Sequence, residues 1–212
     1  MGKGKLGLAA LLLASTSLQA AVPTVSELRS YIMTPTPLTA EQFTDFDRNA
    51  DSQIDVADLV YLLAQDKVID VAFKTGSYVG IFQSDTIVAS GSNGTNEMLP
   101  LEIQLDSLSP VSGKLDNSED NFSLYFPSGS HVLEDLTIND LHIEFTVNVS
   151  SSVPMISSNT ITRTLVFSGD LSAVDNAVAI AGTYEEKISG FEDVQGQGLE
   201  VNRSGNFVLF QE

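Results

Sequence analysis

Six residues in one acidic stretch have the chemistry and the spacing to bind a metal ion. In the twelve residues from Asp47 to Asp58, oxygen-bearing side chains occupy the first, third, fifth, ninth and twelfth positions: Asp47, Asn49, Asp51, Asp55 and Asp58. Gln53 at the seventh position can add its backbone carbonyl oxygen. Calcium takes about six to eight oxygen ligands, and twelve-residue loops between two helices supply them at this spacing. The stretch therefore predicts a calcium site.

The flanking residues favour this interpretation over a solvated acidic turn. Ile54 at the eighth position is apolar, and we expect a helix with an apolar face at residues 56–65. A loop that began at Asp45 would have Val56 in the closing position, so only one register supplies the ligands.

Two residues depart from the usual pattern of such loops. Ser52 stands where the sharp mid-loop turn prefers glycine, because a positive φ is expected there. Asp58 stands where a longer glutamate usually closes the loop with both carboxylate oxygens.

An aspartate at the last position, followed directly by the apolar run from Leu59 to Leu63, resembles the dockerin variant of the EF-hand calcium loop. The resemblance covers Asp47 to Leu63. It implies calcium binding and, as an alternative function, docking to a partner domain. Dockerins carry two such loops in tandem, and no second copy occurs in this sequence.

The first twenty residues have the pattern of a secretory signal peptide. Lys3 and Lys5 precede the apolar run from Leu6 to Ala14, and small residues lead to Ala20, near which we expect cleavage. The run is too short to span a membrane. The alternative is a buried first helix, which lysines placed only in front of the run do not favour. We therefore expect a secreted or periplasmic bacterial protein.

The charge and the absence of cysteine limit the partners and the covalent attachments that this protein can have. Cleavage would remove two lysines and no acids, leaving eight basic and 28 acidic residues and a net charge of −20. A surface this negative disfavours nucleic acid and anionic membranes as partners. The sequence contains no cysteine, which excludes disulfides and a lipid-attachment cysteine.

Residues 21–67 are expected to form a small helical calcium-binding segment. Thr24 with Glu27 and Thr39 with Gln42 have the spacing of capping boxes, which start helices. We expect one helix over residues 25–33, a short one after Thr39, and a third over residues 56–65.

Residues 68–212 alternate between apolar and polar positions, as strands of an antiparallel sheet do. Clear strands are expected over residues 76–82, 99–105, 141–149, 161–167, 178–184 and 207–210, and further strands over residues 111–115 and 121–126. The predicted fold is mainly β, an antiparallel β-barrel or β-sandwich. The barrel is favoured because it leaves no free edges, and the pattern loosely resembles lipocalin-like barrels.

Chemistry elsewhere in the chain is sparse. His131 and His142 could face each other beside Glu134 or Glu144, although a surface histidine is the commoner case. Adjacent acids such as Glu185 and Glu186 point to opposite faces of a strand, so they do not converge on a substrate. No nucleophile elbow, phosphate loop or zinc-protease motif occurs. We therefore expect a protein that is not an enzyme.

The sequence thus predicts a secreted calcium-binding protein whose β domain is non-catalytic and serves binding or assembly. Three alternatives remain open. The β domain could carry a small ligand like a lipocalin, the helical segment could be a dockerin-type adaptor to a protein partner, or the protein could be a hydrolase with unrecognised acids.

Overall fold

The computed structural model describes residues 22–65, 71–84, 98–117, 129–152, 160–175, 177–192 and 195–212. The predicted signal peptide, residues 1–20, and the predicted strand at residues 121–126 lie outside this part of the chain.

Three helices form the predicted helical segment: α1 (Val25–Met33), α2 (Ala40–Phe46) and α3 (Val56–Gln65). Both capping boxes form, with the hydroxyl oxygens of Thr24 and Thr39 accepting the amides of Glu27 and Gln42 at 3.2 and 3.1 Å. The expected bounds of the first and third helices and the expected start of the second are therefore confirmed. None of the described helices has the length and apolarity needed to cross a membrane.

The rest of the described chain is one antiparallel sheet. Its strands are β1 (Gly76–Ser84), β2 (Met98–Leu108), β3 (Val111–Asn117), β4 (Gly129–Val132), β5 (Glu134–Asn139), β6 (His142–Ser152), β7 (Thr160–Val174), β8 (Ala177–Glu192) and β9 (Gly198–Gln211). Their order is β4-β3-β2-β1-β9-β8-β7-β6-β5. The first strand thus pairs with the last, and every other neighbour follows in chain order.

The two ends of this sheet meet at Leu133. β4 pairs with β3 at one end and β5 with β6 at the other, and only Leu133 separates β4 from β5 in the chain. The Leu133 amide donates to the carbonyl of Gly113 at 3.0 Å, and its side chain is buried in the core. The sheet is therefore a nearly closed barrel. This confirms the predicted fold class and selects the barrel over the sandwich.

Most of the described side chains on the inner face of the barrel are apolar, and aromatic rings form a cluster among them. Phe167 stacks on Phe145 with ring centroids 4.8 Å apart and meets Phe207 edge-on at 5.3 Å. Glycine at position 169 makes room for this packing, because a Cβ there would lie 2.8 Å from the Phe207 ring. Such contacts add to the stability that apolar burial provides.

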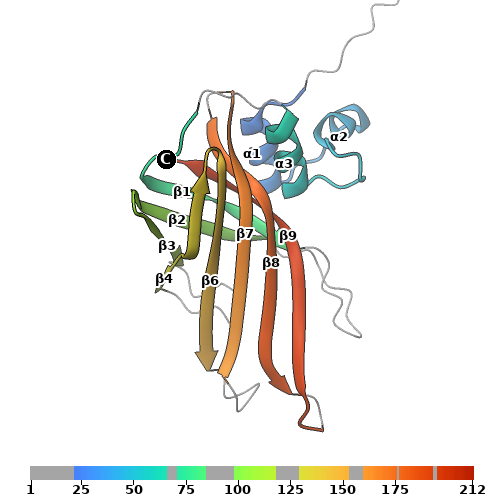
Figure 1. Cartoon of the computed structure of the whole chain (residues 1–212). Coiled ribbons are helices and arrows are strands. Elements are labelled where there is room, and N and C mark those ends of the chain that lie inside the picture. The colour runs from blue at the N-terminus through green and yellow to red at the C-terminus, as the bar shows by residue number, and fades with distance from the viewer. Residues whose placement is uncertain are drawn as a thin grey trace, which may run out of the picture.

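Helices α1 and α3 cover part of the outer face of the barrel, as Figure 1 shows near the upper ends of β7, β8 and β9. Their buried residues form one cluster with outward-facing residues of the sheet: Val25, Leu28, Ile32, Val56, Leu59, Leu62 and Leu63 from the helices, and Ile81, Val174, Ala179, Val208 and Phe210 from the strands. The helical segment and the sheet thus share an apolar interface.

Several strands differ from the prediction. β4 and β5 are not among the strands that the sequence predicted. β8 and β9 are longer than predicted: β8 continues to Glu192, and β9 begins at Gly198. Figure 1 shows β6 to β9 extending well past the short strands. These ends hold few apolar residues, so the signal for them in the sequence is weak.

Leu133→Ala should destabilise the barrel by about 2–5 kcal/mol, because it leaves a cavity where the sheet closes. Val132→Ala is the matched control. Its side chain is 71% exposed, so we expect a loss of less than about 1 kcal/mol. Denaturant unfolding measures both. Equal losses would show that Leu133 has no special part in closing the barrel.

Candidate functional site

The predicted calcium loop connects α2 to α3. Asp47 is the C-cap residue of α2, and Asp58 lies in the first turn of α3. The loop turns sharply at Ala50 and Ser52, whose φ angles are +59° and +72°. Ser52 therefore has the left-handed conformation expected at the middle of the loop, although it is not a glycine.

Asp58 ties the two ends of the loop together. Its Oδ1 accepts the amides of Arg48 and Asn49 at 2.6 and 3.1 Å, and its Oδ2 accepts the amide of Asp55 at 2.8 Å. The residue is fully buried. Burial raises the pKa of the Asp58 carboxyl above its ordinary value, the three amides oppose this rise, and the charge of Asp55 adds to it. The loop therefore encloses the Asp58 carboxyl group. None of the described ion pairs gives the ionised form of this group a cationic partner.

Two further carboxylates organise the middle of the loop. Asp47 accepts the amides of Asp51 and Ser52 at 3.1 and 3.0 Å, and Asp51 accepts the amide of Gln53 at 2.8 Å. A carboxylate oxygen that accepts one amide keeps a second lone pair. These hydrogen bonds and a bound cation are thus compatible.

Asp55 links the loop to the barrel. Its Oδ1 accepts the amide of Ala57 at 2.8 Å at the start of α3, and its Oδ2 accepts the side-chain amide of Gln83 at 3.3 Å. Gln83 lies on β1 and also accepts the amide of Val56 at 2.9 Å. Sequence reasoning missed Gln83, because nothing local connects residue 83 with residue 55.

The donor set fits a hard cation, since all six predicted ligands supply oxygen atoms. In the structure these residues lie along the turn between α2 and α3. Asn49 and Asp51 turn toward each other, with the Asn49 amide donating to Asp51 at 2.9 Å. Within the described ranges, no three acidic, histidine or cysteine side chains are grouped closely enough to hold a metal ion as they stand.

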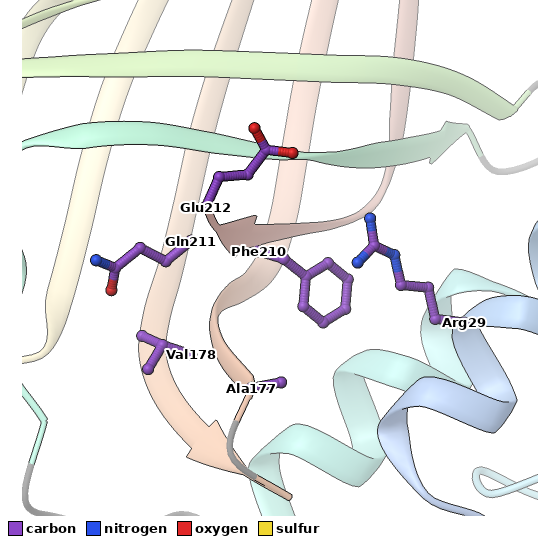
Figure 2. A pocket seen from close by; sticks show the side chains of 6 residues that line it. All are labelled: Arg29, Ala177, Val178, Phe210, Gln211 and Glu212. Atoms are coloured by element: carbon purple, nitrogen blue, oxygen red, sulfur yellow. The ribbon is translucent and has the colours of Figure 1, made fainter.

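A shallow pocket of about 290 Å³ lies between α1 and the ends of β8 and β9 (Figure 2). Arg29 reaches into it from α1, with its guanidinium carbon 4.2 Å from the centroid of the Phe210 ring. Glu212 lies on the other side, so the pocket offers one charge of each sign. A second pocket, of about 260 Å³, lies between α3 and the outer face of β7 and β8. Both pockets open on the outside of the barrel.

His142 on β6 forms the other polar cluster of note. Its Nδ1 lies 2.8 Å from Asp170 Oδ1, and its Nε2 lies 3.3 Å from Glu144 and 3.4 Å from the Ser168 hydroxyl. The serine, histidine and aspartate follow the order of a nucleophile, a base and its orienting acid. His131 is on β4, opposite Leu115 of β3.

This cluster lacks an oxyanion hole, which acyl transfer also requires. β7 pairs with β6 and β8 on both sides of Ser168, so the amides around it belong to the sheet and do not form an oxyanion hole. Glu144 also competes for the same histidine nitrogen. We therefore assign the cluster no catalytic role.

The adjacent acids on β8 diverge as the sequence predicted. Glu185 is exposed, whereas Glu186 points into the barrel, where it forms a buried ion pair with Arg163 of β7. Its other oxygen, Oε2, has no hydrogen-bond partner in the described part of the chain. Arg203 is its cross-strand neighbour on β9.

Comparison with known proteins finds no protein-family model that matches the sequence, and a search of curated proteins finds no match either. The function must therefore be argued from the residues of the site.

The His142 cluster should make stability depend on pH. Hydrogen bonding to Asp170, and less strongly to Glu144, raises the pKa of His142 although partial burial opposes it. The stabilisation is present below the ordinary value of about 6.5 and is lost as the pH rises through the raised value. His142→Gln should thus lower the free energy of unfolding more at about pH 5.5 than at about pH 8.5, by less than about 1 kcal/mol because the groups are exposed.

Denaturant unfolding at the two pH values measures this difference. Asp170→Asn is the control, since it removes the main cause of the raised pKa and should also reduce the pH dependence. A His142→Gln effect that is larger at high pH would contradict the assignment.

Proposed function

We propose that the loop from Asp47 to Asp58 binds calcium and that the ion holds the helical segment in place on the barrel. The observation that carries this proposal is the buried Asp58 carboxylate, which joins both ends of the loop. Backbone amides are its hydrogen-bond partners, and burial disfavours its charge. A cation bound in the loop would offset that unfavourable charge.

The electrostatics of the whole loop support the same conclusion. Asp47, Asp51, Asp55 and Asp58 place four carboxylates in twelve residues, and Arg48 is the one basic residue among them. Like charges at short range repel one another, and a divalent ion relieves several of these repulsions at once. The mixture of side-chain oxygens and a backbone carbonyl suits calcium better than a transition metal, which prefers nitrogen or sulfur ligands.

The barrel serves in this proposal as a non-catalytic scaffold for binding or assembly. The described side chains inside the barrel are mostly apolar or aromatic and are buried, which favours a scaffold over a lipocalin-like carrier with a large internal cavity. The dockerin-type adaptor is also less favoured. The apolar face of α3 that would meet a partner, made by Leu59, Leu62 and Leu63, is buried against the barrel.

Secretion is part of the proposal. Lys3, Lys5 and the apolar run that follows them support export to the periplasm or beyond. Extracellular calcium modules bind with dissociation constants of about 10⁻⁴ to 10⁻³ M. The proposed site would then be occupied in surroundings that contain millimolar calcium.

Calorimetric titration of the chelator-treated protein with millimolar calcium tests the proposal. We expect saturable binding, and calcium at about a hundred times its dissociation constant should stabilise the structure that it orders by about 2.7 kcal/mol. Asp47→Ala should abolish binding, because it removes the first ligand. Asp45→Ala, which removes a carboxylate two residues before the loop, should bind like the wild type. Absence of heat with the wild type would refute the function.

Ser52→Gly should tighten calcium binding. The +72° φ angle of Ser52 is unfavourable for a residue with a Cβ and costs glycine little. If the bound loop keeps this turn more strictly than the free loop does, relief of the strain should improve the binding free energy by about 0.5–1 kcal/mol. Calorimetry measures the change. Weaker binding by the glycine variant would show that the bound loop follows another path.

A further inference from the structure

We propose that Gln83 is the positioning residue of the calcium loop, and that through it calcium occupancy is coupled to the barrel. This inference rests on the proposed calcium function. Gln83 lies outside the loop motif, 25 residues after Asp58 in the sequence, and reaches the loop only because α3 packs on β1.

The Gln83 amide makes two contacts at the junction of loop and helix. Its Oε1 accepts the amide of Val56 at 2.9 Å, and its Nε2 donates to Asp55 Oδ2 at 3.3 Å. Only this orientation of the amide pairs a donor with an acceptor at both contacts. One side chain therefore holds the ninth residue of the loop and the first residue of α3 together.

The chemistry of both partners explains why a glutamine suits this position. Val56 begins α3, and the first amides of a helix have no acceptor within the helix. Asp55 needs a donor that orients its carboxylate and leaves its negative charge available to a cation. A lysine or arginine would supply no acceptor for Val56 and would compete with the ion, and a glutamate would repel Asp55.

The backbone of Gln83 is held firmly. It pairs with Met98 of β2 on one side and with Asn206 of β9 on the other. Ile81, two residues earlier, points to the same outer face and packs in the apolar cluster beneath α3. The two hydrogen bonds thus lie at the edge of that cluster. A displacement of Asp55 would therefore change the contacts of both α3 and β1.

Partners of this kind hold metal ligands in position, and their removal typically weakens metal binding by about 10- to 100-fold. A calcium ion bound by the Asp55 carboxylate would in turn restrict the motion of the Gln83 side chain and of the first turn of α3. The barrel strand would then gain protection when the loop is filled.

The test compares Gln83→Met with Gln104→Met. Methionine keeps the length of the side chain and removes both hydrogen bonds. Gln104 is a partly exposed residue on β2, and among the described contacts its side chain makes no hydrogen bond to the helical segment. Far-ultraviolet circular dichroism should show that both variants keep the sheet.

Calcium calorimetry and hydrogen exchange give two readouts. We expect Gln83→Met to bind calcium about 10- to 100-fold more weakly than the wild type, and Gln104→Met to bind unchanged. In chelator, the amides of Val56 to Leu59 should exchange faster in Gln83→Met alone. At saturating calcium, the β1 amides near residue 83 should gain protection in the wild type and in Gln104→Met, and not in Gln83→Met.

The failures of the two proposals are distinguishable. If the wild type and Gln83→Met bind calcium equally and exchange alike, the role of Gln83 is refuted and the calcium site stands. If the wild type gives no heat, the calcium function is refuted and the coupling with it. Protection of β1 by calcium in all three proteins would also overturn the coupling through Gln83.

Discussion

Where they pair with each other, strands β1 and β9 carry apolar side chains on both faces, and much of the structure follows from this constraint. Phe82 and Phe207 point into the barrel, whereas Ile81 and Val208 point outward and are equally buried. A strand of this kind needs cover on both sides. The inner cover comes from closure of the sheet, which pairs the first strand with the last, and the outer cover comes from α1 and α3. The helical segment thus covers apolar surface that the barrel would otherwise expose.

Buried charge distinguishes the loop from the rest of the molecule. Among the described residues, the buried charged side chains are Asp58, Arg163 and Glu186. Arg163 and Glu186 neutralise each other inside the barrel. The hydrogen-bond partners of Asp58 are backbone amides, and further carboxylates lie nearby. Burying an ion without a counter-charge is costly, and this imbalance is the physical reason to expect a cation in the loop.

Local patterns were sufficient to predict the helices, the loop and the core strands. Capping boxes mark helix starts because the side chains bond to amides three residues away, so the starts of α1 and α2 were predicted. Alternating apolar residues identified the middle of the long strands, such as the run from Leu141 to Val149. The six predicted ligands were named from their spacing alone. Each of these inferences uses interactions within about a dozen residues of sequence.

Closure of the sheet and the link to the loop were decided only by the tertiary structure. β4 and β5 are short and polar, and they become strands because β3 and β6 offer them partners at the two ends of the sheet. Gln83 meets Asp55 only after β1 has paired with β9 and α3 has packed on that pair. Contacts between residues so far apart in the sequence depend on the whole fold, so no local pattern specifies them. The sequence by itself determined a β domain and predicted a calcium loop before it, and the packing of one on the other determined how they are joined.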